Sequence, residues 1–299
     1  MSQENGHYMY YPGCSLKATS RAYGVSTEQV AKALGLTLQE IKDWNCCGAT
    51  AAEPVSHLLS YALPARNIAL AEKNGTEDIL VPCSACYLNL KKVEMERKKD
   101  RGLSTQIDEV LSEEDLILEN KLNIRHLLDV LANDIGPDMI KDTMKAQKAH
   151  DLSDLKVAPY YGCQAIRPYQ VFDNGEAPKS MEPLIRACGA EVFEWEAGGK
   201  CCGASNMNTK SHAAEILVQR ILEDAAGADV IATICPMCQL NLEGYQDKIS
   251  KKSGQELSIS VLYLPQLIGA ALGLSNEALM LDKNLAIKKD VLERLGFDV

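Results

Sequence analysis

Apolar residues recur along this chain with two different spacings. Short apolar or alternating runs are typical of buried strands, and longer runs with apolar residues three and four positions apart are typical of helices. In the first half, strands are predicted at 7–11, 36–41 and 78–82. Helices are predicted at 26–34, at 54–73, from the C-x-x-C motif at Cys83 onward and at 124–131, with a charged, exposed helix or loop at 98–120.

The same order of elements returns in the second half. The predicted strands are 156–161, 191–195 and 229–234, and the predicted helices are 178–188, 210–226 and 236–249. Residues 258–262 and 265–272 mirror the region 124–131. Because strands alternate with helices, we expect an α/β fold of two pseudo-symmetric, duplicated domains, each with a small, mainly parallel sheet flanked by helices. A polar stretch at 141–153 sets the boundary between an N-terminal domain, 1–150, and a C-terminal domain, 151–299.

Composition narrows the class of protein. A chain of 299 residues is long enough for two domains. The formal net charge of −10 argues against nucleic acid as a partner, because its phosphates would be repelled. The longest apolar stretch, 261–274, contains Pro265 and is shorter than the roughly 20 residues that a membrane span needs. The first residues show no secretory signal, so we expect a cytoplasmic protein with no membrane span, in which thiols stay reduced.

Ten of the eleven cysteines form two sets with the same order. Each set has a lone cysteine in an aromatic–glycine turn, then Cys-Cys-Gly-Ala, then a C-x-x-C followed by x-Leu-Asn-Leu. Since parallel sheets place function at the carboxyl ends of strands, we expect all ten cysteines there. The first set is Cys14, Cys46, Cys47, Cys83 and Cys86, and the second is Cys163, Cys201, Cys202, Cys235 and Cys238. Cys188 lies outside the pattern and is predicted to be an ordinary buried thiol.

Reduced cysteines in such motifs are more often metal ligands or redox groups than disulfides. Tetrahedral zinc takes four ligands and a cubane iron–sulfur cluster is commonly held by four thiolates. A fifth cysteine is therefore surplus, or it allows a cluster of unusual shape with a bridging thiolate. Small Gly48 and Ala49 would let backbone N–H groups approach sulfur and tune its potential. A zinc-binding structural or assembly module, or a dithiol switch, remains an alternative at this stage.

The source of electrons is expected to lie outside this chain. No glycine-rich nucleotide loop is present, so we expect no flavin or nicotinamide bound by this chain. The ferredoxin run C-x-x-C-x-x-C-x-x-x-C-P is also absent from the sequence. A redox role would therefore need a partner that supplies the electrons.

The two copies of the cysteine pattern resemble the cysteine-rich CCG-domain family over residues 8–272, and most of all the B subunit of the heterodisulfide reductases. The resemblance implies one non-cubane 4Fe-4S cluster on each set of five cysteines. It also implies reduction of the mixed disulfide of coenzyme M and coenzyme B to two thiols, with electrons from the iron–sulfur C subunit and the flavin-containing A subunit of heterodisulfide reductase. Iron–sulfur subunits of glycolate and lactate oxidases and a succinate dehydrogenase subunit share the CCG motif. An electron-transfer subunit of a 2-hydroxy-acid oxidase or quinone-linked complex is therefore the alternative.

The duplication suits disulfide chemistry. A disulfide has two similar sulfurs and its cleavage takes two electrons, so two centres facing one cleft could each serve one sulfur. Two centres far apart, with no cleft between them, would contradict this hypothesis. The anionic groups of the substrate would need cations, for which the candidates are Arg167, Lys17, Arg21, Lys200 and Lys210. Trp44 and Trp195, near the two Cys-Cys pairs, are predicted to pack around the centres.

Overall fold

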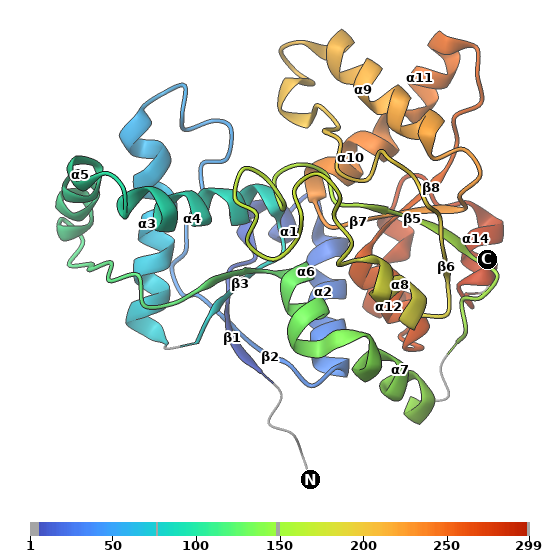
Figure 1. The fold of residues 1–299 in the computed structure, drawn as a ribbon, viewed down its shortest axis with the longest axis horizontal. Helices are drawn as coiled ribbons and strands as arrows, with labels where there is room; N and C mark the ends of the chain where they lie inside the picture. Colours follow the sequence, from blue (N-terminus) through green and yellow to red (C-terminus); the bar gives the residue numbers. More distant parts are fainter. Residues whose placement is uncertain (1–5, 76, 148–149, 298–299) are drawn as a thin grey trace.

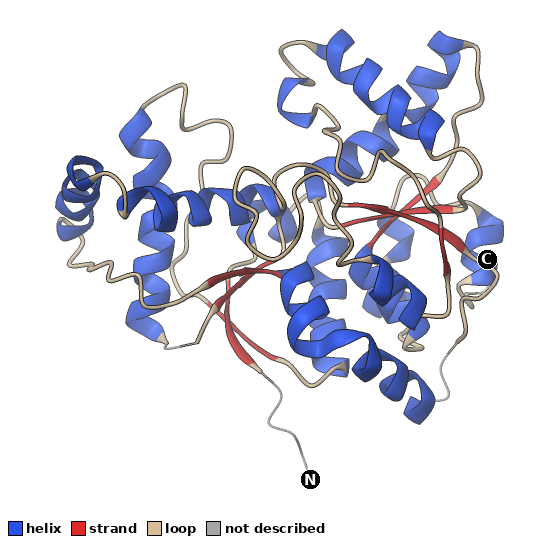
Figure 2. Cartoon of the chain, viewed as in Figure 1, coloured by secondary structure: helices blue, strands red, loops and turns tan. Residues whose placement is uncertain are grey.

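The computed structural model describes residues 6–75, 77–147 and 150–297, and its elements confirm a duplicated α/β fold (Figures 1 and 2). Each half contains one four-stranded sheet, and all the strand pairs within it are parallel. The two sheets have equivalent strand orders, β2-β1-β3-β4 and β6-β5-β7-β8. The strands of the first sheet are β1 (His7–Tyr10), β2 (Thr37–Glu40), β3 (Ile79–Val81) and β4 (Ile124–His126). Those of the second are β5 (Lys156–Tyr160), β6 (Glu191–Val192), β7 (Val230–Thr233) and β8 (Ser260–Tyr263).

Helices connect and cover the strands in both halves (Figure 1). Several begin at the capping residues that the sequence offers, such as Ser56, whose Oγ accepts the Leu59 N–H. The helices of the first half are α1 (Gly13–Lys17), α2 (Arg21–Ala33), α3 (His57–Asn74), α4 (Ser84–Arg97), α5 (Arg101–Ser112), α6 (Leu127–Asp129), the π-helix η1 (Val130–Ile135) and α7 (Gly136–Gln147). Those of the second half are α8 (Glu182–Ala187), η2 (Ala204–Asn206), α9 (Ser211–Asp224), α10 (Pro236–Gly244), α11 (Gln246–Ser253), α12 (Leu264–Ala271), α13 (Asn276–Leu279), η3 (Leu281–Lys283) and α14 (Lys289–Arg294).

The helix predicted at 124–131 is wrong at its start. Ile124–His126 forms strand β4, which pairs with β3 and opens the helical segment at Leu127. Its apolar residues have helical spacing, but the backbone of these three residues completes the sheet edge instead. The second half repeats this arrangement with β8 followed by α12.

Other predicted boundaries shift without changing the element type. The strand expected at 191–195 is limited to Glu191–Val192, and the helix expected at 178–188 is limited to Glu182–Ala187. The helix expected at 236–249 is divided into α10 and α11 near Tyr245. Helix α7 runs into the polar stretch at 141–153 and buries Ile140.

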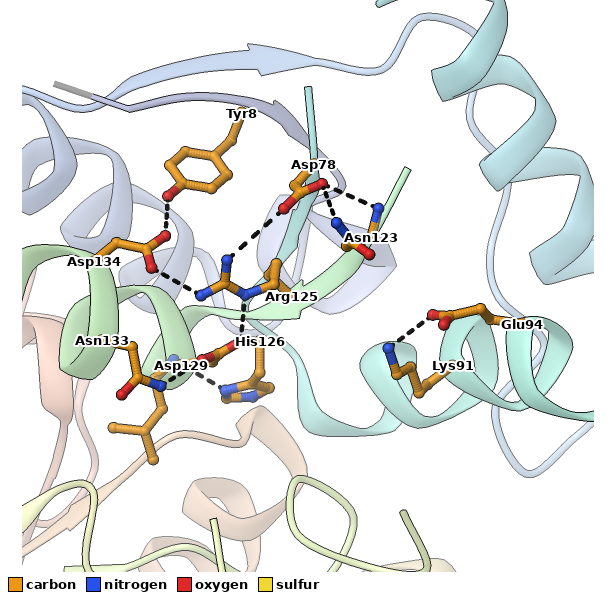
Figure 3. Close-up of polar contacts among 11 residues, drawn as sticks. Tyr8, Asp78, Lys91, Glu94, Asn123, Arg125, His126, Asp129, Asn133 and Asp134 are labelled. Atoms are coloured by element: carbon orange, nitrogen blue, oxygen red, sulfur yellow. Dashed lines mark hydrogen bonds and ion pairs between the residues drawn. The ribbon is translucent and has the colours of Figure 1, made fainter. Parts of the chain in front are cut away.

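Strand β4 is fixed by a network of charges around Arg125 (Figure 3). The guanidinium forms ion pairs with Asp129, with Asp134 at 2.9 Å and with Asp78 at 3.7 Å. Asp134 also accepts a hydrogen bond from the Tyr8 hydroxyl of β1. The network therefore links the first sheet to the π-helix that follows β4.

A shared core lies where the two halves meet. Helix α2 of the first half packs against α12 and α13 of the second. Val30 of α2 and Leu267 of α12 are both buried in a hydrophobic cluster that includes residues from both halves. The second half also has a separate cluster around β5, β7 and α9. No helix in the described part of the chain is long and apolar enough to cross a membrane.

Candidate metal centres

Both cysteine sets lie at the carboxyl ends of parallel strands. Cys14 is in α1, just after β1, and Cys83 lies between β3 and α4. Cys235 lies between β7 and α10 in the matching place. Because neighbouring strands are parallel, their carboxyl ends meet at one edge, which gathers each set. We call the two sets the first quintet (Cys14, Cys46, Cys47, Cys83, Cys86) and the second quintet (Cys163, Cys201, Cys202, Cys235, Cys238).

The thiols of the first quintet contact one another. The Cys47 and Cys86 Sγ atoms are 3.4 Å apart, and the Cys14 and Cys46 Sγ atoms are 3.6 Å apart. Cys47, Cys83 and Cys86 are buried, whereas Cys14 and Cys46 are exposed. The quintet therefore has a buried side against the sheet and an open side toward solvent.

The second quintet repeats this arrangement. The Cys202 and Cys238 Sγ atoms are 3.5 Å apart, which matches the contact between Cys47 and Cys86. Cys202, Cys235 and Cys238 are buried and Cys201 is exposed, while Cys163 is half-buried. The Cys201 Sγ also accepts the Gly203 N–H at 3.3 Å, so the small residue after the Cys-Cys pair brings a backbone donor to sulfur.

One thiol of the first quintet and two of the second favour the thiolate form. Hydrogen bonds with neighbouring cysteines raise the pKa of four others, Cys46, Cys86, Cys163 and Cys238. A hydrogen bond from Cys46 lowers the pKa of Cys47 to about 3, with a further hydrogen bond from Cys86. A hydrogen bond from Cys163 lowers the pKa of Cys201 to about 6. The Cys238 thiol, together with backbone N–H groups at the start of α10, lowers the pKa of Cys235 to about 7. Each quintet therefore offers anionic sulfur, which is the form that binds metal.

Cys188 belongs to neither quintet. Its side chain is fully buried, and burial raises the pKa of the thiol to about 12. The prediction of an ordinary buried thiol is confirmed for this residue.

A glycine leaves room for sulfur beside each lone cysteine. A Cβ at Gly13 would lie 2.8 Å from Cys86 Sγ, and one at Gly162 would lie 3.0 Å from Cys238 Sγ. Both glycines have positive φ, +73° and +66°, a conformation that disfavours side chains. The aromatic–glycine turns therefore bring the lone cysteine and the C-x-x-C motif together.

A tyrosine hydroxyl donates a hydrogen bond to the residue before each Cys-Cys pair. The Tyr11 hydroxyl donates to the Asn45 carbonyl at 2.8 Å, and the Tyr160 hydroxyl donates to the Lys200 carbonyl at 2.7 Å. Those carbonyls immediately precede Cys46 and Cys201. The tryptophans near the pairs pack on these rings, Trp44 on Tyr11 at 5.5 Å and Trp195 on Tyr160 at 6.1 Å between ring centroids.

The segments that carry the two C-x-x-C motifs meet at the junction of the halves. The buried Tyr23 hydroxyl lies 2.9 Å from the Pro82 carbonyl and 3.0 Å from the Ile234 carbonyl, which precede Cys83 and Cys235. Its ring stacks on Tyr263, with centroids 4.2 Å apart. Ser84, inside the first C-x-x-C, donates to the Ile234 carbonyl at 3.2 Å. One tyrosine and one serine thus join the two C-x-x-C segments.

A small cavity of about 40 Å³ opens beside the second quintet. All five cysteines of that quintet line it, and Thr50 and Ser84 of the first half complete its wall. The cavity is therefore shared between the halves, although its cysteines come from one of them.

The candidate cations occupy different environments. Lys17 pairs with Glu40 at 2.7 Å, and Lys200 pairs with Asp224 at 3.8 Å. Arg21 is exposed and lines a separate cavity of about 390 Å³ between residues 18–22 and α10. Lys210 is exposed at the start of α9.

Arg167 is held close to the second quintet. Its guanidinium donates to the carbonyls of Gly175 and Gly199. Its charge also helps to lower the pKa of Cys201. Arg167 therefore acts on a quintet thiol while its donors are engaged with the backbone.

The donor set fits an iron–sulfur cluster in its chemistry. Five thiols per half, with at least one in each half that favours the anionic form, match the thiolate ligands of such clusters. Among the described residues, no three or more His, Cys, Asp or Glu side chains are arranged around a point as for one metal ion. The thiols contact one another in pairs instead.

Sequence reasoning did not identify the residues that support the quintets. Tyr11, Tyr160, Tyr23 and Ser84 were not among the predicted site residues. The tyrosines before Gly13 and Gly162 recur in both halves, and that repetition was a usable signal. Tyr23 and Ser84 form hydrogen bonds across the junction of the halves, and no sequence motif marks either residue.

Comparison with known proteins places this geometry in a family. The model of the CCG cysteine-rich domain matches twice, at residues 8–91 and 157–243, which is more than half of the chain. The chain belongs to the cysteine-rich CCG-domain family. Both matched regions contain one complete quintet.

Relatives of this chain include proteins named as subunits of reductases. It is 33% identical over 282 residues to the 8-methylmenaquinol:fumarate reductase membrane anchor subunit of Wolinella succinogenes, covering 93% of this chain and 96% of that protein. It is 30% identical over 283 residues to the B subunit of the ferredoxin/F420H2-dependent CoB–CoM heterodisulfide reductase of Methanosarcina acetivorans, covering 92% of each. A protein of Archaeoglobus profundus, described as like the B subunit of heterodisulfide reductase, is 28% identical, over 90% of this chain and 92% of that protein. These findings support an iron–sulfur subunit of an oxidoreductase.

A solved structure supports the fold alone. The crystal structure of a hypothetical protein from Helicobacter pylori superposes with a TM-score of 0.74 at 14% identity. The superposition covers 97% of this chain and 53% of that one, so this chain spans about half of the solved protein.

Proposed function

We propose that each quintet holds one non-cubane 4Fe-4S cluster and that the chain is the catalytic subunit of a disulfide reductase. When bound, such clusters supply single electrons and an affinity for sulfur. The first cluster would use the first quintet and the second cluster the second quintet. The substrate class is a small-molecule disulfide, of which the coenzyme M–coenzyme B heterodisulfide named in the relatives is the first to test.

The observation that carries this proposal is the junction of the two C-x-x-C segments. Tyr23 contacts the carbonyls that precede Cys83 and Cys235, and Ser84 reaches across to the second half. Cleavage of a disulfide to two thiols takes up two electrons and two protons. Two one-electron sites held together by one junction could supply these two electrons to one disulfide, and two distant sites could not.

The residues of this chain would bind and orient the reactants. The first turn of α10 directs the backbone N–H groups of Met237 and Cys238 toward Cys235, where anionic sulfur is stabilised. The buried side of each quintet excludes water. Arg167 is the candidate for an anionic substrate group at the second quintet, with Lys17, Arg21, Lys200 and Lys210 as the further candidates.

The electrons would come from partner proteins. An iron–sulfur partner, equivalent to the C subunit of heterodisulfide reductase, would dock near the exposed side of a quintet. A flavin-containing partner, equivalent to the A subunit, would feed electrons to it. The relatives, which are named as subunits of complexes, support this arrangement.

Metal analysis of protein purified without oxygen tests the proposal. About eight irons and eight acid-labile sulfides per chain are expected for two four-iron clusters. Cys235→Ser is expected to lose about half of the iron, and Cys188→Ser, the matched control outside the quintets, is expected to keep all of it. Zinc in place of iron would contradict the proposal and favour a structural zinc module.

A second candidate is favoured by the Wolinella succinogenes relative. On this hypothesis, the chain passes electrons in a quinone-linked or 2-hydroxy-acid-oxidising complex and reduces no disulfide itself. The ion pairs of Lys17 and Lys200 also leave fewer free cations for an anionic disulfide. A new paramagnetic signal when the heterodisulfide is added to oxidised protein supports disulfide reduction, and a signal that responds only to a quinol supports electron transfer.

A further inference from the structure

The two quintets differ in the donors that surround their sulfurs. The duplication makes the difference visible because each residue can be compared with its counterpart at the same distance from a matching cysteine. Ser84 stands directly after Cys83, where the second half has Pro236. Arg167 stands four residues after Cys163, where the first half has Ala18.

Ser84 is a hydrogen-bond donor that crosses the junction. Its side chain is buried, and its Oγ lies 3.3 Å from His126 Nε2. His126 Nδ1 accepts the Leu128 N–H, so the ring proton sits on Nε2 and is donated to Ser84. The serine proton is therefore free to point to the second half.

Two acceptors of the second half lie within reach of that proton. One is the Ile234 carbonyl at 3.2 Å, which also receives the Tyr23 hydroxyl. The other is the Cys235 thiol, which lines the same cavity as Ser84. Pro236 has no hydroxyl, so the first quintet receives no matching bond from its counterpart.

Arg167 adds a full charge on the same side. Its guanidinium is bound to the carbonyl of Gly199, two residues before Cys201. The side chain is half-buried, where a charge is screened less than at the open surface. Ala18 gives the first quintet no charge at the corresponding position.

One difference acts in the opposite direction. The Asn89 amide donates to Cys47 Sγ at 3.6 Å, whereas its counterpart Asn241 donates to the Cys202 carbonyl at 3.1 Å. A neutral amide at this distance stabilises negative sulfur less than a guanidinium and a hydroxyl together. Backbone N–H donors from Gly48 and Gly203 serve both quintets and cancel in the comparison.

We propose that Ser84 and Arg167 give the centre of the second quintet a higher reduction potential than that of the first. The inference rests on the proposed function, since it requires a cluster in each quintet. Reduction adds negative charge, and nearby donors and cations stabilise that charge. One electron supplied by an iron–sulfur donor to the first quintet would therefore move to the second, which borders the cavity. In that transfer, the first centre would be oxidised by one electron and the second would be reduced by one.

A redox titration of the holoprotein followed by electron paramagnetic resonance tests this order. Dithionite is the reductant, and signals are assigned from Cys14→Ser and Cys163→Ser, each of which disturbs one centre. Ser84→Ala is expected to lower the potential of the second centre and leave the first unchanged. We expect the equilibrium constant for electron transfer from the first to the second centre to fall about tenfold, which is 59 mV for a one-electron couple.

Ser205→Ala is the matched control for Ser84→Ala. Ser205 lines the same cavity but is exposed. It is expected to leave both potentials unchanged. A Ser84→Ala protein in which both potentials move equally, or neither moves, would overturn the proposal, because a general structural effect would act on both centres.

Arg167 supplies an independent test if Ser84→Ala does not bind iron. Arg167→Gln is expected to lower the potential of the second centre, and Arg167→Lys, which keeps the charge, is expected to retain most of it. If the second centre had the same reduction potential in Arg167→Gln as in Arg167→Lys, the result would count against the role of the charge. Wild-type protein without two iron–sulfur centres would instead refute the proposed function itself, and the two failures are therefore distinguishable.

Discussion

The first quintet depends on the absence of a side chain at Gly13. At φ +73°, an added methyl group would lie 2.8 Å from Cys86 Sγ, the same sulfur that lies 3.4 Å from Cys47 Sγ. Gly162 has the same relation to Cys238. The absence of a side chain at Gly13 and Gly162 therefore helps to set the geometry of each quintet.

Gly13→Ala is expected to destabilise the protein by about 1–3 kcal/mol, because it combines a left-handed backbone with a steric overlap. The first quintet should also bind less iron, while the second is unaffected. Denaturant unfolding and iron content per chain measure the two effects. Gly244→Ala is the control, since nothing lies within 4 Å of the added methyl group. Equal effects of the two substitutions would show that the contact with Cys86 is unimportant.

His126 makes stability depend on pH. Burial lowers the pKa of its imidazole to about 3, so the ring stays neutral in the folded protein. The unfolded chain binds a proton near the ordinary pKa of 6.5 and the folded chain does not, so stability falls as pH drops from about 6.5 toward 3. The slope contributed by this residue is at most about 1.4 kcal/mol per pH unit.

His126→Gln is expected to reduce that slope, with thermal unfolding compared between pH 7.5 and 5.5. His57→Gln, at an exposed position, is the control and should leave the slope unchanged. A wild-type slope that persists in His126→Gln would mean that other groups cause it. This range avoids stronger acid, in which sulfide is lost.

At the level of elements, strand β4 is secured by charge as well as by pairing. The Arg125 side chain is about one-fifth exposed, and Asp129, its closest partner, is 7% exposed. Figure 3 shows the guanidinium between three carboxylates, those of Asp78 just before β3, Asp129 of α6 and Asp134 of the π-helix. Removal of the cation would leave the nearly buried Asp129 carboxylate without this partner.

Arg125→Ala is therefore expected to lower the free energy of unfolding by about 3 kcal/mol, a typical value for removing one partner of a buried ion pair. Arg186→Ala is the matched control, because its pair with Glu194 is exposed and should be worth less than about 1 kcal/mol. Both are measured by denaturant unfolding. A loss in Arg125→Ala no larger than in Arg186→Ala would show that the network is solvated.

The elements that could be predicted are those that the duplication repeats. The strand–cysteine–helix units at Cys83 and Cys235 follow directly from buried runs and the shared tail. Strand β4 could not be predicted, because Ile124 and Leu127 also fit a helical spacing and only the edge of the sheet decides between them. Contacts such as Tyr23 with Ile234, 211 residues apart, depend on how two finished halves pack, which no local pattern records.

At the level of the whole molecule, the halves are joined by more than a linker. The hydrophobic cluster of the first half continues through α12 into the second. Tyr23 lies at the centre of this junction, fully buried and stacked on Tyr263. At the matching position of the second half, Phe172 stacks on His126 in the same manner but has no hydroxyl. Because the core is shared, we expect thermal unfolding of the two halves in one transition.

Tyr23→Phe should keep that single transition and lower its midpoint. The ring is retained, as Phe172 shows that a phenylalanine fits such a site, but two carbonyls lose a donor. The expected loss is about 1 kcal/mol, a typical hydrogen-bond contribution, since Ile234 keeps the bond from Ser84. Scanning calorimetry measures the midpoint, and Tyr245→Phe, a half-buried tyrosine away from the junction, is the control. Two separate transitions in the wild-type protein, or an unchanged midpoint in Tyr23→Phe, would mean that the halves fold independently and that the junction does not fix the distance between the quintets.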